Sequence, residues 1–203
     1  MARPKRDISI PDLLRRRGRY RKFGWGALVL LILSILLDRS GTFGYQGDDW
    51  TRFDKQTVKV VHVSDGDSMV VADAGTDKQT KVRLIGVDTP ELEGDNHWAQ
   101  HAHAYTRGRL ANRSVTLKLD GTQTRDRYDR LLAYVYVTDS DNLNLALVRD
   151  GQAYADRRHG HTMRSQFESA EAEARKKGRG LWKAVRDDQQ PQWRQDWLKR
   201  RGQ

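Results

Sequence analysis

The chain has 203 residues, of which 37% are hydrophobic and 32% are charged, with 17 Gly, 4 Pro and no Cys. A chain of this length holds one core of ordinary size with appendages, and its composition excludes collagen-like, proline-rich and fully disordered proteins. Without Cys, the sequence also excludes disulfide scaffolds, thiol nucleophiles and cysteine-ligated metal sites.

The net charge of +10 is concentrated at the two ends of the chain. Residues 1–22 carry nine basic and two acidic side chains, and residues 183–203 carry six and three. Residues 38–182 contain equal numbers of both signs. A basic isoelectric point is therefore no evidence that the central part of the chain binds polyanions, and such a function must rest on particular residues.

The N-terminal segment predicts export or anchoring. Basic residues 1–22 precede the uncharged apolar run 23–37, which as a helix would span about 22 Å of a hydrocarbon layer of about 30 Å. Because residues 38–42 offer no small-x-small cleavage site, we favour an uncleaved anchor over a cleaved signal peptide. The positive charge before the run predicts a cytoplasmic N-terminus and a single-pass cell-membrane protein whose domain lies outside the cytoplasm. Cleavage would instead give a periplasmic or secreted protein.

After this segment, residues 38–56 are polar and rich in glycine, which predicts a linker. We expect the folded domain over residues 57–182 and a basic, Trp-containing tail over 183–203. Runs rich in β-branched residues predict five strands, at 58–63, 68–72, 81–87, 114–119 and 131–137.

Hydrophobic residues at helical spacing predict helices over residues 97–111 and 163–177, and Asn144 is expected to cap a short helix over 145–150. Five short strands with a helix between the third and fourth are the arrangement of an OB-type closed barrel. We therefore expect an α+β, mainly β fold: a five-stranded OB barrel with three helices, preceded by the N-terminal hydrophobic helix.

Four clusters within this pattern carry candidate chemistry, although each alone is ordinary turn or surface composition. Together, in this order and on this strand pattern, they resemble the staphylococcal nuclease-like, or thermonuclease, family over about residues 58–182. The resemblance implies a monomeric nuclease that cuts DNA or RNA and leaves 3′-phosphate ends. The clusters are Asp-Gly-Asp-Ser at 65–68, Arg-Leu-Ile-Gly-Val-Asp-Thr-Pro-Glu at 83–91, Asp-Arg-Tyr-Asp-Arg at 126–130 and Gly-Arg-Gly-Leu-Trp at 178–182.

Arg83 and Arg130 are the candidate catalytic cations. Attack on a phosphodiester builds negative charge on its oxygens, and a planar guanidinium suits two phosphate oxygens. The resemblance implies that Arg83 clamps the scissile phosphate and that Arg130 meets the developing charge. The alternatives are a barrel-rim residue for Arg83 and, for Arg130, a surface charge paired with Asp126 or Asp129.

Asp67 and Asp88 each lie at the end of a predicted strand, and adjacent carboxylates repel each other unless a cation or a shared proton lies between them. Oxygen ligation without His or Cys selects a hard cation such as Ca²⁺ or Mg²⁺. The resemblance implies Ca²⁺ on both carboxylates and on the backbone carbonyl of Thr89, with Asp65 in support. Taken singly, the aspartates are turn and cap residues.

The resemblance also assigns a general base and a nucleotide contact. Glu91 follows Pro90, which limits where its carboxylate points, and would activate the attacking water. Arg127 and Tyr128 would lie against the nucleotide, by phosphate contact or by stacking, and the alternative for Tyr128 is packing across the barrel edge.

Three further features invite interpretation. The resemblance implies tyrosines at the positions of Asp156 and His159, and Arg157 and Arg158 between them could bind phosphate instead. The histidines at 97, 101, 103, 159 and 161 do not have zinc-ligand spacing, so we do not expect them to bind metal. We expect the tail, with Trp193 and Trp197, to be loosely docked or disordered rather than an amphipathic membrane contact.

These observations favour a Ca²⁺-dependent nuclease. The main alternative is an inactive nuclease-like module that binds nucleic acid or protein, because a fold does not fix an activity. A weaker alternative is a structural membrane protein that uses the barrel for partner contact. The presence of Asp67, Arg83, Asp88, Glu91 and Arg130 together favours the enzyme.

Overall fold

A computed structural model of the chain describes residues 49–72, 78–92 and 97–202. The predicted anchor at 23–37, the basic segment before it and most of the linker lie outside the described residues. None of the helices in the described part combines the length and apolarity that a bilayer crossing requires.

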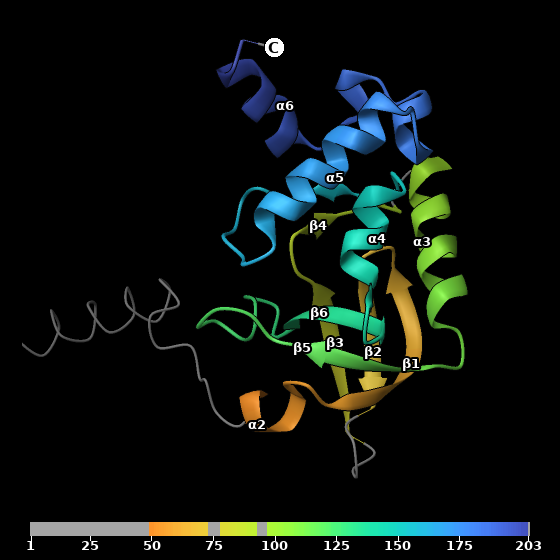
Figure 1. The fold of residues 1–203 in the computed structure, drawn as a ribbon, viewed down its shortest axis with the longest axis vertical. Coiled ribbons are helices and arrows are strands. Elements are labelled where there is room, and N and C mark those ends of the chain that lie inside the picture. Colours follow the sequence, from red (N-terminus) through yellow and green to blue (C-terminus); the bar gives the residue numbers. More distant parts are fainter. Residues whose placement is uncertain (1–48, 73–77, 93–96, 203) are drawn as a thin grey trace, which may run out of the picture. The chain divides into compact units, whose positions relative to one another are not determined.

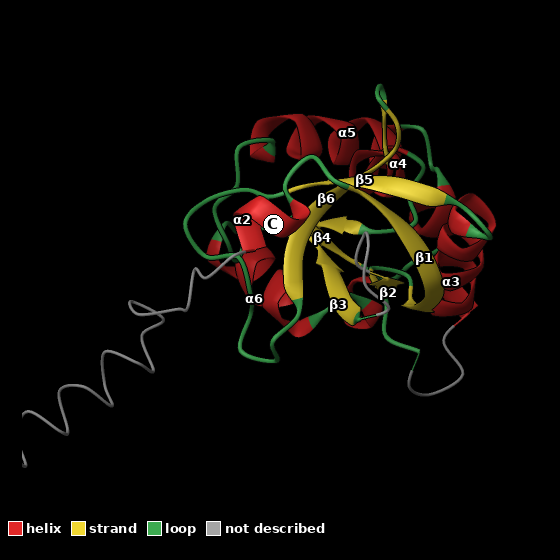
Figure 2. Ribbon diagram, turned by 90° about the horizontal axis from the view of Figure 1, so that it is seen from below, coloured by secondary structure: helices red, strands yellow, loops and turns green. Residues whose placement is uncertain are grey.

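The core of the described fold is a closed β-barrel. The strands follow the order β3-β2-β1-β5-β6-β7, and a parallel pairing of β3 with β6 closes the ring. Figure 2 looks into this ring of strands. The five-stranded barrel predicted from the sequence is therefore confirmed. The strands are β1 (Thr57–Asp65), β2 (Ser68–Ala72), β3 (Gln79–Leu84), β5 (Ser114–Lys118), β6 (Leu131–Thr138) and the short β7 (Asp141–Asn142).

Alternation along the strands fills the barrel. Val58 and Val60 of β1 point inward, while their neighbours along the strand are exposed. β1 carries register shifts between Val60 and His62 and again between Val63 and Asp65. Such bulges bend a strand and increase its twist, which a small closed barrel requires.

The predicted strand at 81–87 is two strands rather than one. β3 ends at Leu84, and β4 (Val87–Asp88) pairs with β8 (Tyr154–Ala155) in a separate two-stranded sheet. Gly86 between them has φ +74°, and a Cβ there would lie 2.5 Å from the ring of His161. Only glycine fits this bend without strain. The bend carries Asp88 out of the barrel wall and over the barrel end.

The three predicted helices are present, as α3 (His97–Leu110), α4 (Leu143–Arg149) and α5 (Arg164–Lys176). The predicted cap of α4 was wrong by two residues, because Asn142 caps the helix by accepting from Leu145 N. Asn144 is instead buried, accepts from Val135 N and donates to Ile85 O and Ala133 O. An amide side chain serves either role, so composition alone did not separate them.

Residues expected in the linker form α2 (Asp49–Phe53), which lies at the other end of the barrel from α5 (Figure 1). Phe53 is fully buried, and Asp49 accepts hydrogen bonds from Arg125 and Thr124. The folded unit therefore includes residues ahead of position 57.

The C-terminal tail is ordered, so the prediction of a loosely docked tail was wrong. After the 3₁₀ turns η1 (Gly180–Lys183) and η2 (Asp187–Gln189), the chain forms α6 (Gln192–Arg200). Arg194 of α6 is 0% exposed and pairs with Glu171 of α5 at 2.8 Å. The tail is therefore held to the domain in part by a buried ion pair.

Candidate active site

Asp67 and Asp88 meet at one end of the barrel. Asp67 begins the β2 side of the β1–β2 turn, and Asp88 ends β4. Both are buried, and Arg83 lies between them: its Nη1 is 2.6 Å from Asp67 Oδ2, and its Nη2 is 3.1 Å from Asp88 Oδ1. Two carboxylates that are 21 positions apart in the chain are therefore within the width of one guanidinium.

Thr89 ties the two strand ends together. Its backbone N–H and its hydroxyl donate to Asp67 Oδ2 at 3.0 and 3.1 Å. These bonds satisfy a buried carboxylate that would otherwise be costly. They also hold Asp67 beside the residue that follows Asp88.

Helix α3 fixes the turn from the other side. Thr106 donates to the carbonyl of Gly66 at 2.6 Å. A Cβ at Gly66 would lie 2.7 Å from Thr89 and 2.9 Å from Ala102, so only glycine allows α3, the turn and Thr89 to pack together. The glycine of the Asp-Gly-Asp pattern is thus required by packing as well as by turn chemistry.

Arg130 reaches the same cluster through Ser68. Its Nη1 donates to Ser68 Oγ at 3.4 Å, and Ser68 donates to Asp67 Oδ1 at 3.0 Å. The parallel register of β3 and β6 places Arg83 opposite Leu132, which brings the start of β6 to this end of the barrel. Asp126 accepts from Arg130 Nε at 2.7 Å, so the ion pair foreseen as an alternative holds the side chain at the rim of the site.

Tyr128 projects from the loop before β6. Its side chain is 62% exposed, so it does not pack across the barrel edge. The guanidinium carbons of Arg127 and Arg130 lie 4.8 and 5.4 Å from the centre of its ring. An exposed ring flanked by two cations is a surface on which a base can stack beside its phosphate.

The carboxylates of the cluster disfavour each other's charge. Glu91 is exposed, but partial burial of its carboxylate raises its pKa, and the charges of Asp65, Asp67 and Asp88 raise that pKa further. Burial likewise raises the pKa of Asp65 and that of Asp88, although hydrogen bonds to each oppose the effect. A bound cation relieves this kind of repulsion.

Two further residues contact Asp88: Arg158, which the sequence offered only as a phosphate contact, and Trp193, which it did not offer as a site residue. Arg158, whose side chain is 41% exposed, lies 2.9 Å from Asp88 Oδ1 and also pairs with Asp156. Trp193 of α6 donates from Nε1 to Asp88 Oδ2 at 2.8 Å. The sequence offered phosphate binding for Arg157 and Arg158 together, but Arg157 is paired with Glu171 instead. No local pattern linked Trp193 to a residue 105 positions earlier.

The donor set suits a hard cation. Within the described ranges, no three His, Cys, Asp or Glu side chains form a group that could hold a metal ion. A site with two carboxylates, Asp67 and Asp88, needs a backbone carbonyl and water as its other ligands, which is a coordination that Ca²⁺ and Mg²⁺ accept. Arg83 Nη1 is buried and close to Asp67, but it lacks the alignment of a hydrogen bond. The cationic position between the carboxylates is thus imperfectly filled by the guanidinium, and the residues present fit such an ion.

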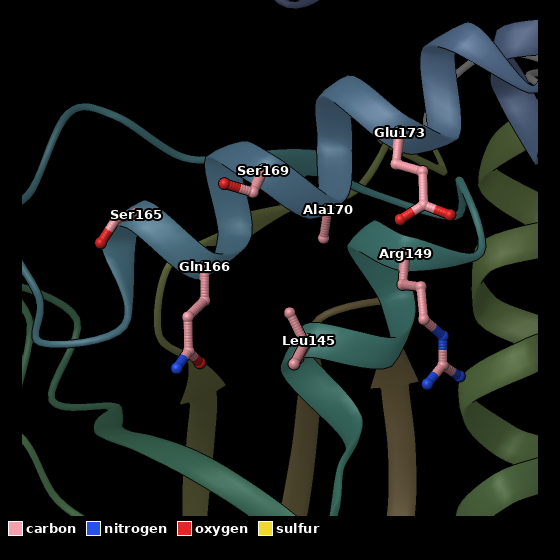
Figure 3. Close-up of a pocket in the computed structure, with 7 residues that line it drawn as sticks. All are labelled: Leu145, Arg149, Ser165, Gln166, Ser169, Ala170 and Glu173. Atoms are coloured by element: carbon pink, nitrogen blue, oxygen red, sulfur yellow. The ribbon is translucent and has the colours of Figure 1, made fainter.

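A groove of about 630 Å³ between α4 and α5 is separate from this site (Figure 3). The reactive groups described above do not contribute to its lining. Its residues are Leu145, Arg149, Ser165, Gln166, Ser169, Ala170 and Glu173.

Comparison with known proteins gives consistent results. The family model described as "Staphylococcal nuclease homologue" matches residues 81–184. The thermonuclease of Staphylococcus hyicus is 35% identical over 159 residues, which is 75% of this chain and 90% of the relative. The thermonuclease of Staphylococcus intermedius is 33% identical over 172 residues, 80% of this chain and 98% of the relative. An uncharacterized endonuclease of Haemophilus influenzae is 33% identical over 141 residues, 70% and 74% of the two chains.

Proposed function

The chain belongs to the staphylococcal nuclease family, and from that premise we propose that it is a cation-dependent nuclease that hydrolyses phosphodiester bonds in DNA or RNA. One observation carries the proposal. Asp67 and Asp88 share the guanidinium of Arg83, and Arg130 reaches the carboxylate of Asp67 through Ser68. Paired acidic ligands beside two arginines are what a phosphodiester and its cation require.

We propose Ca²⁺ as the ion, held by the carboxylates of Asp67 and Asp88 and by the carbonyl of Thr89. When bound, the ion supplies positive charge that stabilises the anionic transition state. Oxygen ligands alone favour a hard cation. Asp65 lies on the same turn, and its raised pKa reflects burial first and the charge of Asp67 second, which supports a site built for an added cation.

Arg83 is proposed to exchange its carboxylate partners for a non-bridging oxygen of the scissile phosphate. Its fork binds carboxylate and phosphate with the same geometry. Arg130 would pair with the charge that develops during attack, because Asp126 holds it at the rim, where its side chain is 28% exposed.

Glu91 is proposed to accept a proton from water. The water oxygen then bonds to phosphorus, the bond from phosphorus to O5′ breaks, O5′ takes up a proton from solvent, and the phosphate stays on O3′. The pKa of Glu91 is raised by burial and by neighbouring carboxylates, which makes its carboxylate a better base than an ordinary glutamate. Arg127 and Tyr128 would hold the adjoining nucleotide.

The membrane location remains a proposal drawn from the sequence. The apolar run 23–37 behind a basic segment supports a single-pass anchor with the nuclease domain outside the cytoplasm, or a cleaved signal that releases it. A monomer is proposed from the family alone. Fractionation of cells with and without protease treatment of the outer face tests the location.

Incubation of the full chain with labelled DNA and RNA tests the activity. With Ca²⁺, both the loss of substrate and 3′-phosphate ends on the fragments are expected, and excess chelator should stop cleavage. Cleavage that continues unchanged in chelator would contradict the cation. Binding without cleavage under all conditions would favour the inactive module instead.

A further inference from the structure

The carboxylate of Asp88 is held on both of its oxygens. The Nη2 atoms of Arg83 and Arg158 lie 3.1 and 2.9 Å from Oδ1, and the indole Nε1 of Trp193 donates to Oδ2 at 2.8 Å. We propose that Trp193 is a positioning residue that orients Asp88 for cation binding, so that helix α6 contributes to the active site. This inference rests on the proposed function.

The buried contacts of Arg194 at the start of α6 fix the position of Trp193. Arg194, the next residue, is fully buried: its Nη1 donates to Glu171 Oε1 at 2.8 Å and its Nε donates to Gln190 Oε1 at 2.7 Å. Its guanidinium also lies over the rings of Tyr154 and Trp182, at 5.3 and 5.1 Å. Burying a charge is costly unless it is paired. Nη2 of Arg194 has no hydrogen-bond partner among the described residues, but Nε and Nη1 are paired, and these bonds hold the start of α6 in one position.

Glu171, the partner of Arg194, is also connected to Asp88 through the backbone. Glu171 Oε1 also accepts from Ala155 N at 3.0 Å, and Ala155 belongs to β8. Its neighbour Tyr154 pairs with Asp88 in the β4–β8 register. Glu171 therefore holds both the helix that carries Trp193 and the strand that pairs with Asp88. These contacts keep the indole N–H within hydrogen-bond distance of the Asp88 carboxylate.

The chemistry of an indole suits this role. Its N–H donates and cannot accept, so it binds an accepting carboxylate oxygen and brings no charge of its own into the site. By holding Oδ2, Trp193 leaves Oδ1 facing Arg83, on the side that Asp67 shares. Outer hydrogen bonds of this kind orient a ligating carboxylate, and their removal typically weakens metal binding about 10- to 100-fold.

Trp193→Phe tests the proposal, because it removes the N–H and keeps a ring beside Arg158, whose guanidinium carbon lies 5.1 Å from the indole centre. Trp197→Phe is the matched control: Trp197 lies one turn later on α6 and stacks with Arg157 and Arg201. Calorimetric titration of each full-length variant with Ca²⁺, without nucleic acid, measures the affinity. We expect a loss of about 10- to 100-fold for Trp193→Phe and little change for the control.

Equal or tighter Ca²⁺ binding by Trp193→Phe would overturn the proposal, and tighter binding would mean that the indole competes with the ion. Trp193→His, which keeps a ring N–H donor, should recover part of the lost affinity. Equal losses in the Phe and His variants would contradict the hydrogen-bond role, and thermal unfolding of each variant checks that the fold is kept. If the wild-type chain binds no cation, both this inference and the proposed function fail. If it binds and cleaves while Trp193→Phe is unaffected, only this inference fails.

Discussion

The residues on the two sides of Asp88 differ in how far their positions could be predicted from the sequence. On one side, the barrel end brings Asp67, Arg83 and Thr89 together through short turns and paired strands. On the other side, helix α6 places Trp193 on the same carboxylate from 105 positions away. The first arrangement follows from local patterns. The second depends on tertiary contacts that no local pattern specifies, and the experiments below test whether both sides matter.

The largest effect is expected from Arg83→Ala at the barrel end. Loss of one charged partner of a transition state typically costs about 100- to 1,000-fold in turnover. Single-turnover cleavage of a labelled oligonucleotide measures the loss, and the fold should be kept. Arg164→Ala, which removes an exposed partner of Glu168, is the control and should leave cleavage unchanged. Unchanged cleavage by Arg83→Ala would contradict the catalytic role of Arg83 at the barrel end.

On the other side, Arg194→Ala should act through stability. It leaves the buried carboxylate of Glu171 without one of its two guanidinium partners, since Arg157 remains. Breaking a buried pair costs about 3 to 5 kcal/mol, and the remaining partner places the expected loss near the lower end. Urea unfolding measures it. Lys177→Ala breaks an exposed pair with Glu173 and should have no measurable effect, so equal midpoints for the two variants would mean that α6 is not anchored.

A smaller effect is expected at the exposed loop. Tyr128→Ala should weaken nucleic-acid binding by about 1 to 3 kcal/mol, because a stacking ring contributes about that much per base. KM should rise with kcat nearly unchanged, and Tyr128→Phe should keep most of the affinity. A fall in kcat with KM unchanged would place Tyr128 in the chemical step instead.

The smallest effects concern acid stability on the two sides. Burial opposes the ionisation of Asp126 and Asp156, but hydrogen bonds from Arg130 and Arg158, respectively, dominate and lower each pKa below its ordinary value. Each therefore stabilises the fold above its ordinary pKa, and that contribution is lost as the pH falls through the folded-state pKa. Asp126→Asn and Asp156→Asn should each lower stability at neutral pH and flatten its decline in acid. An unchanged pH profile for either variant would contradict its ion pair.

The barrel was predictable because period-two alternation and turn residues repeat along the chain. Three features were not. Gly86 breaks the third predicted strand because the backbone must turn Asp88 over the barrel end. Asn142 and Asn144 are chemically equal candidates for a cap and are both buried, and only their hydrogen-bond partners separate them. The tail was expected to be loosely docked or disordered, yet Arg194 within it pairs with Glu171, which is buried on α5.

The candidate site divides in the same way. Asp67, Arg83 and Asp88 could be nominated from the joint motif pattern that resembles the family, and the strand ends that carry them converge when the barrel closes. Arg158 could be nominated only together with Arg157, since neighbouring arginines look alike in sequence and their separate acidic partners decide their roles. Trp193 required the fold itself.

The central claim is that Asp67 and Asp88 hold one ion together. Calorimetric Ca²⁺ titration of Asp67→Asn, Asp88→Asn and the double variant tests it most directly, because ligands of one ion are strongly non-additive. We predict that each single variant loses nearly as much affinity as the double variant. Small, additive losses, or unchanged binding in either single variant, would contradict the claim.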